Sequence, residues 1–215
     1  MKPKIDVLLV DDHSVVRAGY RLLLSQSAVI GEIFEADGGE SACRIYADNQ
    51  PDLVIMDLSM PGIGGLNAIR RITSRDSRAR ILVFSIHEEP IYVTKALEAG
   101  AKGYITKRSA PNIMLEAVIQ IAEGKSYIER ALRQNKKALS EAVQPSSVRV
   151  ENLSGREFEV FLCLARGLTT REIAEQLCLS HKTVANYSTA IKNKLEVNTG
   201  AEIAKIAYDL DLLAH

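Results

Sequence analysis

Acidic residues, a hydroxyl and a lysine follow or end four short apolar runs of the sequence. Asp11 and Asp12 follow IDVLLV, Asp57 follows LVIM, Ser85 ends RILVFS and Lys107 follows KGYIT. Such runs predict buried strands, and open α/β sheets bind ligands outside the carboxyl ends of their strands. Three carboxylates gathered there need a cation, and an oxygen-rich site of this kind suits Mg²⁺. A carboxylate nucleophile beside a metal, a lysine and a hydroxyl is chemistry for a phosphoryl group.

Each of these residues also has an ordinary explanation when it is taken alone. Turns favour Asp, and lysines are mostly exposed, so only convergence of the strand ends supports a site. The glycine-containing stretch PGIGGLNAI does not follow the strand–GxGxxG–helix pattern, and no GxxxxGK[ST] occurs. Nucleotide binding through a phosphate loop is therefore not predicted.

The elements that must position these residues alternate along the first half of the chain. Apolar runs are separated by segments with helical spacing, and the runs cover residues 5–10, 29–36, 53–57, 80–85 and 102–106. Strands that alternate with helices predict a parallel sheet with helices on both faces. We expect a flavodoxin-like, doubly wound, five-stranded parallel sheet over residues 1–125.

The charges of the chain are balanced, and its composition is typical of a soluble globular protein. The 215 residues include 27 basic and 27 acidic ones, so any nucleic-acid role must be local. No signal-peptide or transmembrane-length apolar segment occurs, which predicts a cytoplasmic protein without a membrane partner. Cys43, Cys163 and Cys178 lack metal-ligand spacing and are expected to be small buried thiols in a reducing compartment.

The pattern changes after residue 125. Residues 126–148 lose the strand signal and end in Pro145-Ser146-Ser147, which indicates a linker. Residues 149–215 predict a second, all-α domain of four helices that start near 155, 170, 181 and 200. Ser154, Thr169 and Thr199 are each followed three residues later by Glu, and Ser180 is a good N-cap.

The middle two of these helices are joined by only Cys178, Leu179 and Ser180, as a helix-turn-helix requires. The helix over residues 181–195 carries Lys182, Lys192 and Lys194 and no acid. Yet residues 149–215 hold eight basic residues against nine acidic ones, so an ordinary four-helix bundle with a solvated lysine face stays open.

The stretches VLLVDDH, LVIMDLSMPGIGG, LVFS and GYITK resemble the receiver domain of bacterial two-component response regulators. The resemblance implies that Asp57 accepts a phosphoryl group from the phosphohistidine of a sensor histidine kinase. It also implies that Asp12, Asp57 and the backbone carbonyl of Ser59 ligate Mg²⁺, with Asp11 acting through water. Lys107 would pair with the phosphoryl group, Ser85 would move to it, and Tyr104 would swing inward. The family often has proline after this lysine, where this chain has Arg108.

The stretch from Leu153 to Val197 is similar to the LuxR-type helix-turn-helix of the NarL/FixJ response regulators. This resemblance implies double-stranded DNA as a partner, with the helix over 181–195 in the major groove. Asn186 and Thr189 would face base edges, and the phosphate contacts would come from Thr170, Arg171, Lys182 and Thr183. Lys192 and Lys194 are also counted among the DNA-binding residues. Ala185 and Tyr187 stand where the family commonly has lysine and histidine. The tyrosine resembles the GacA/UvrY branch of the family, which also carries a tyrosine at that position.

The sequence is therefore read as a response regulator that dimerises and controls transcription when Asp57 is phosphorylated, and not as an enzyme. Two alternatives remain at this point. One is a DNA-binding regulator that is independent of phosphorylation and uses the receiver only for docking. The other is an aspartyl-phosphate phosphatase or transferase, for which Ser59 offers no second acid next to Asp57.

Overall fold

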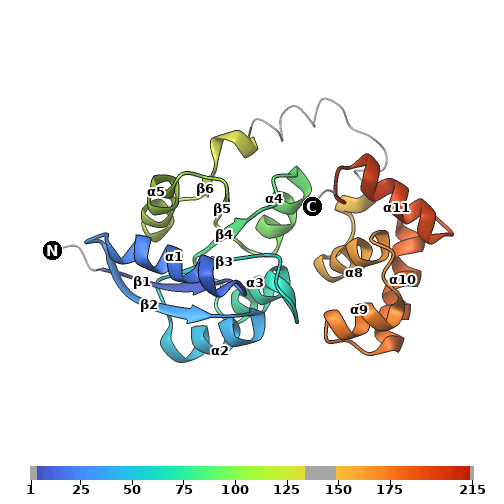
Figure 1. The fold of residues 1–215 in the computed structure, drawn as a ribbon, viewed down its shortest axis with the longest axis horizontal. Coiled ribbons are helices and arrows are strands. Elements are labelled where there is room, and N and C mark those ends of the chain that lie inside the picture. The colour runs from blue at the N-terminus through green and yellow to red at the C-terminus, as the bar shows by residue number, and fades with distance from the viewer. Residues whose placement is uncertain (1–3, 134–148, 214–215) are drawn as a thin grey trace. The chain divides into compact units, whose positions relative to one another are not determined.

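The computed structural model describes residues 4–133 and 149–213, and the chain divides into two units, Met1–Gln134 and Asn135–His215 (Figure 1). The first unit is a parallel sheet with helices on both faces. Its strands are β1 (Ile5–Val10), β2 (Ile30–Ala36), β3 (Leu53–Met56), β4 (Ile81–Ser85), β5 (Gly103–Thr106) and β6 (Tyr127–Ile128). Its helices are α1 (Ser14–Ser25), α2 (Gly39–Asn49), α3 (Gly64–Arg75), α4 (Pro90–Glu98) and α5 (Pro111–Ala122).

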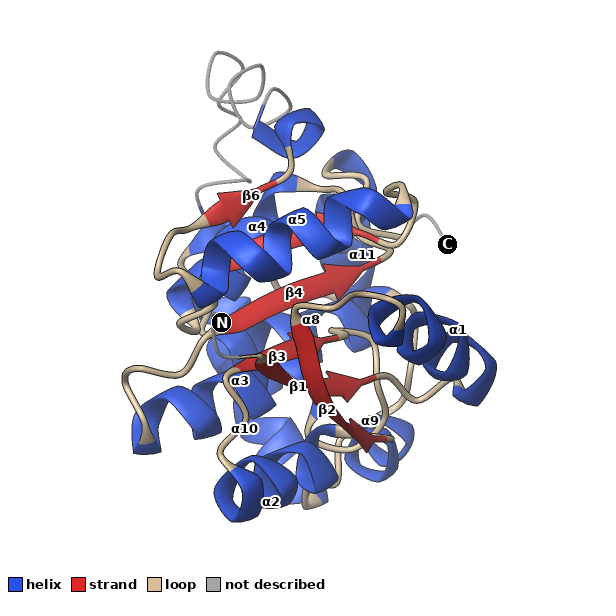
Figure 2. Ribbon diagram, turned by 90° about the vertical axis from the view of Figure 1, so that its left-hand side faces the viewer, coloured by secondary structure: helices blue, strands red, loops and turns tan. Residues whose placement is uncertain are grey.

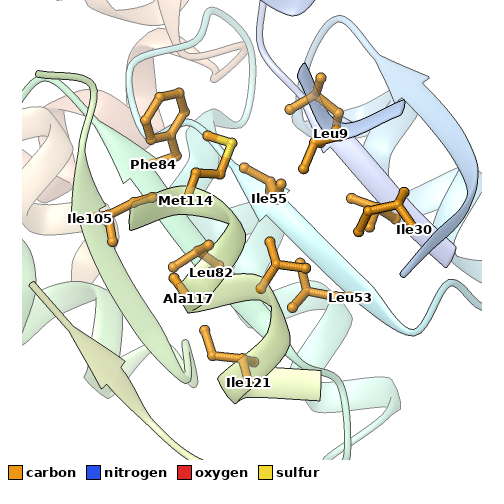
Figure 3. Packing of buried hydrophobic residues seen from close by; sticks show 13 residues of the cluster. Leu9, Ile30, Leu53, Ile55, Leu82, Phe84, Ile105, Met114, Ala117 and Ile121 are labelled. Atoms are coloured by element: carbon orange, nitrogen blue, oxygen red, sulfur yellow. The ribbon is translucent and has the colours of Figure 1, made fainter. Parts of the chain in front are cut away.

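The strands run parallel in the order β2-β1-β3-β4-β5-β6, and Figure 2 shows this succession across the sheet. β3, β4 and β5 are buried at every residue, as expected for strands covered on both faces. Alternate side chains of these strands, among them Leu82 and Phe84, pack on α5 through Met114 and Ile121 (Figure 3). The doubly wound fold expected from the sequence is confirmed.

The sheet has six strands rather than the five that were expected. β6 pairs with β5 through Gly103↔Tyr127 and Tyr104↔Ile128. It lies in the segment that the sequence assigned to a linker, because two residues at a sheet edge give no apolar run to detect. The receiver-like unit therefore continues past residue 125. Residues 134–148 of the expected linker lie outside the described residues.

The second unit is helical, with α8 (Gly155–Ala165), α9 (Thr170–Gln176), α10 (His181–Leu195) and α11 (Gly200–Asp209). All four predicted starts are confirmed, and Ser154, Thr169 and Thr199 each form a complete capping box. Ser180 caps α10 by accepting a hydrogen bond from the backbone of Thr183. Each cap satisfies backbone N–H groups that have no partner inside the helix.

Two expectations about cysteine and membrane segments can be compared with the fold. Cys163 is buried and Cys43 half-buried, but Cys178 is exposed, contrary to the expectation of a buried thiol. Cys178 occupies the turn between α9 and α10, outside the packed faces of both helices, and has a left-handed conformation with φ +51°. Among the helices of residues 4–133 and 149–213, none has the length and apolar character to cross a bilayer.

Candidate functional site

Parallel pairing brings the predicted residues to one edge of the sheet. Val10 of β1 pairs with Met56 of β3, so Asp11 and Asp57 both follow directly on neighbouring strands. Beyond the last paired residues, the Asp57 N–H donates to the Val10 carbonyl at 3.0 Å, and the Lys107 N–H donates to the Ser85 carbonyl at 2.8 Å. These bonds continue the ladder by one residue and fix where the side chains leave the sheet.

The ammonium of Lys107 joins the two most buried carboxylates of this edge. Its Nζ lies 2.6 Å from Asp11 Oδ2 and 2.8 Å from Asp57 Oδ2, while each aspartate is only 2% exposed. Burial raises the pKa of Asp57 above its ordinary value, and the attraction of Lys107 only partly opposes this effect. Burial disfavours the charged lysine, but attraction to Asp57 and hydrogen bonds to both aspartates prevail, so the pKa of Lys107 is raised.

An acidic cluster surrounds this ion pair. Ligand atoms of Asp11, Asp12, His13 and Asp57 all lie within 4.8 Å of one another. Asp12 Oδ1 is buried and accepts no hydrogen bond, although His13 Nδ1 lies 3.0 Å from it, because the geometry of that contact is not that of a hydrogen bond. A buried carboxylate oxygen without a donor, in an oxygen-rich set, fits a hard cation such as Mg²⁺.

The loop after β3 approaches Asp57 through backbone. Ser59 is exposed, and its N–H donates to Asp57 Oδ1 at 3.2 Å. At Gly65 a Cβ atom would meet Leu58 Cα at 2.7 Å and also the carbonyl oxygen of Asp57, so only glycine lets α3 start this close to the site. Gly65 therefore shapes the entry of the chain into α3 beside Asp57.

Ser85 and Tyr104 are linked through one residue, His87. The His87 N–H donates to Ser85 Oγ at 3.3 Å, and the Tyr104 hydroxyl donates to the His87 carbonyl at 2.9 Å. Tyr104 is fully buried in this arrangement, which raises the pKa of its phenol well above the ordinary value. The tyrosine thus points inward, in the orientation that the sequence associated with the switched state.

Sequence reasoning gave His87 no role, and the structure places it at the centre of this corner. Its Nε2 lies 2.9 Å from Ser59 Oγ, and its ring stacks on Tyr92 with centroids 3.9 Å apart. The imidazole therefore joins the loop after β3 to α4. Its position two residues after Ser85 was the only sequence signal available for it.

In the second unit, α10 presents a polar stripe at helical spacing. Lys182, Asn186 and Thr189 are exposed, and Asn193, which the sequence prediction omitted, continues the same stripe at position i+11. The opposite face is buried through Val184, Ile191 and Leu195. The helix therefore has one face packed into its unit and one face free for a ligand.

The other predicted contact residues differ in how available they are. Thr170 is exposed at the start of α9, Lys192 is half-buried, and Thr183 Oγ1 lies 2.7 Å from Ser180 Oγ of the cap. Arg171 pairs with Glu175 one turn later, at 3.1 Å.

Lys194 has a more definite partner inside its own unit. Its Nζ lies 2.7 Å from Glu157 Oε2, and the same carboxylate caps α8. Burial alone would raise the pKa of Glu157, but the bonds from Lys194 and Ser154 outweigh it and hold the pKa below its ordinary value.

Comparison with known proteins identifies both units. Residues 7–119 match the family described as "Response regulator receiver domain", and residues 151–207 match "Bacterial regulatory proteins, luxR family". The chain is a response regulator with a LuxR-type DNA-binding domain. Such regulators receive a phosphoryl group from a sensor kinase and control transcription through a LuxR-type DNA-binding domain, and dimerisation is typical of them.

Two relatives of this response regulator span nearly its whole length, and a solved structure matches a shorter part of it. "Transcriptional activator protein ExaE" of Pseudomonas putida is 43% identical over 96% of this chain and 97% of its own. "Response regulator UvrY" of Escherichia coli K12 is 38% identical over 94% and 93%. A solved LuxR-family response regulator from Aurantimonas sp. is 38% identical, with TM-score 0.62, over 64% of this chain and 99% of its own.

Proposed function

We propose that Asp57 is the residue that accepts the phosphoryl group. The observation that carries this proposal is the position of Lys107 Nζ, 2.8 Å from Asp57 Oδ2 at the carboxyl edge of the sheet. In the transfer, a carboxylate oxygen of Asp57 forms a bond to phosphorus while the phosphorus–nitrogen bond of the donor phosphohistidine breaks. The departing imidazole nitrogen keeps the electron pair and takes up a proton from solvent.

The residues around Asp57 have separate tasks in that step. Lys107 neutralises charge on the phosphoryl oxygens, and the Ser85 hydroxyl donates to one of them after moving. Asp12, Asp57 and the Ser59 carbonyl would hold Mg²⁺, with Asp11 acting through water, and the ion would neutralise the equatorial oxygens. Support for this ion comes from the buried Asp12 Oδ1, which accepts no hydrogen bond.

We assign DNA binding to the exposed stripe of α10 and to the start of α9. Thr170 and Arg171 of α9 and Lys182 and Thr183 of α10 contact phosphates. Asn186 and Thr189 face base edges, where Asn pairs with adenine and Thr meets a thymine methyl. Phosphorylation favours dimers, in which two such helices read half-sites about one DNA turn apart. Because bacterial DNA lies in the cytoplasm, a DNA partner supports a cytoplasmic location.

Intact-mass measurement after incubation with phosphoramidate and Mg²⁺ tests the acceptor. One phosphoryl group should be added to the wild-type chain and to Asp48→Asn, which changes an exposed carboxylate of α2, but not to Asp57→Asn. Addition to Asp57→Asn would overturn the assignment. In a separate assay with a small phosphoester, sustained release of many phosphates per chain would instead support the alternative phosphatase or transferase.

The switch needs its own measurement. Phosphorylated wild-type protein should dimerise and bind promoter DNA more tightly than Asp57→Ala, as followed by analytical ultracentrifugation and fluorescence anisotropy. Equal dimerisation and equal DNA affinity in the two proteins would favour the regulator that is independent of phosphorylation.

A further inference from the structure

The loop that carries Lys107 is held by a carboxylate from beyond the five-stranded core. Glu129 Oε2 accepts a hydrogen bond from the Thr106 N–H at 3.0 Å and one from Ser109 Oγ at 2.6 Å. These donors flank Lys107 on both sides. On its other side the loop is tied to β4, because the Lys107 N–H donates to the Ser85 carbonyl.

Glu129 reaches this position because the chain returns to the sheet after α5. The residue follows β6 directly, and its own N–H donates to the Tyr104 carbonyl at 3.0 Å, which extends the pairing with β5. Close approach requires glycine at position 103, where a Cβ would lie 2.6 Å from the Tyr127 carbonyl. A two-residue strand is weakly held by its ladder, and the two bonds to Glu129 add to it.

We propose that Glu129 is a positioning residue for Lys107 in phosphoryl transfer. It touches none of the reacting atoms, but it accepts from the Thr106 backbone N–H on one side of the lysine and from the Ser109 side-chain hydroxyl on the other. Hydrogen bonds to a charged carboxylate are stronger than neutral ones, so one side chain can hold a four-residue loop from two points. With that backbone fixed, Nζ stays within reach of Asp57 Oδ2, where the phosphoryl oxygens arrive.

This inference rests on the proposed role of Lys107, and the experiment separates the two. Full-length wild-type protein, Glu129→Ala, Glu129→Gln, Lys107→Ala and the Glu129→Ala/Lys107→Ala double variant are phosphorylated with phosphoramidate and Mg²⁺. Rates are measured by intact mass over a range of donor concentration. Glu116→Ala is the matched control, since its carboxylate on the exposed face of α5 accepts from Gln120 and, among the residues that the structure describes, from no other side chain.

If Glu129 acts through Lys107, Glu129→Ala lowers the maximal rate about tenfold, as loss of precise placement does. Glu129→Gln keeps an acceptor oxygen and stays within about threefold of wild type, and Glu116→Ala is unchanged. In the Lys107→Ala background, adding Glu129→Ala changes the residual rate less than about twofold, because the two changes act on one group. A wild-type rate in Glu129→Ala, or an equal effect in both backgrounds, overturns the proposal.

A second readout follows the lysine itself. In ¹⁵N-lysine spectra, the Lys107 ammonium is assigned by its absence in Lys107→Ala. We expect Glu129→Ala to speed hydrogen exchange of this ammonium. We expect the thermal unfolding temperature of Glu129→Gln to stay near that of wild type. An unaltered Lys107 signal in Glu129→Ala contradicts positioning. A Lys107→Ala variant that is phosphorylated at the wild-type rate refutes the role of the lysine, whatever Glu129 does.

Discussion

Lys107 Nζ lies 2.8 Å from Asp57 Oδ2, and the same nitrogen lies 2.6 Å from Asp11 Oδ2. Both carboxylates are nearly inaccessible to water, so one ammonium neutralises charge that the solvent cannot screen. Removal of one member of a buried ionic group leaves the other members uncompensated, which destabilises a fold far more than loss of a surface pair does.

Lys107→Ala should therefore lower the free energy of unfolding by about 3 kcal/mol in the absence of divalent ions. Mg²⁺ should raise the melting temperature of this variant more than that of wild type, because the freed carboxylates bind the cation more tightly. Thermal unfolding followed by circular dichroism, with EDTA or with Mg²⁺, measures both. Lys125→Ala removes an exposed pair with Glu123 and should cost about 0.5 kcal/mol or less. A Lys107 variant that resembles this control would contradict the account.

Asp57 itself should make stability depend on pH in an unusual direction. Burial raises its pKa above the ordinary 3.8, so the folded state holds its proton more firmly than the unfolded state does. Its contribution to stability therefore falls as pH rises from 3.8 through the raised value, and the loss persists above that value.

Asp57→Asn does not titrate, so its advantage in stability over wild type should grow with pH. Urea unfolding in EDTA at about pH 4 and about pH 7 gives the difference at each end of this range. Asp48→Asn, on the exposed side of α2, should show no such trend. A pH-independent difference between Asp57→Asn and wild type would mean that the buried carboxylate carries no ionisation penalty.

Glu157 predicts the opposite dependence in the second unit. Its pKa lies below the ordinary 4.5, so its stabilisation is present above that value and disappears as pH falls through the lowered one. Glu157→Gln should lower the free energy of unfolding by about 1–2 kcal/mol at neutral pH, since a cap and an ion pair are both weakened. The variant should also lose part of the acid sensitivity of wild type in urea titrations followed by circular dichroism. Equal sensitivity in both proteins would assign acid unfolding to other carboxylates.

Lys182 and Lys194 should differ as DNA contacts, although both lie on α10. Both lysines are exposed, but the Lys194 ammonium lies 2.7 Å from the Glu157 carboxylate, which neutralises it. Lys182→Ala should weaken binding on all sequences and reduce the slope of log affinity against log salt by about 1. Lys194→Ala should leave that slope nearly unchanged. Fluorescence anisotropy over a series of salt concentrations measures both slopes. Equal slopes for the two variants would show that Lys194 also contacts a phosphate.

Local sequence signals were sufficient for much of this fold. The apolar runs that ended in Asp11, Asp57 and Lys107 predicted strands to within a residue or two, and capping residues predicted all four helix starts of the second unit. Both signals work because they depend on neighbours in the chain: a short continuous apolar run in a strand buried on both faces, and the N–H groups of a helix's first turn.

What the sequence did not predict depends on partners distant in the chain. β6 forms because its two residues pair with the free edge of β5. Glu129 accepts a hydrogen bond from Thr106, which lies 23 positions earlier in the chain. Lys194 was read as a DNA contact because Glu157, 37 positions away, could not be placed beside it. His87 stood in no periodic pattern at all. The roles proposed for the residues around Asp57 stay predictions until they are measured.

The parallel order of the strands has a consequence for the life of the molecule. Lys107 bonds to Asp11 across 96 positions and to Asp57 across 50, and the sheet between them must be complete before these atoms meet. Contacts of such long range are slow to form, because the loop-closure entropy must be met before they stabilise the fold. A full-length chain that has not folded, or that has partly unfolded, contains every residue of the site but does not bring them together. Only molecules whose receiver has finished folding can therefore be phosphorylated at this site, so a misfolded receiver cannot signal.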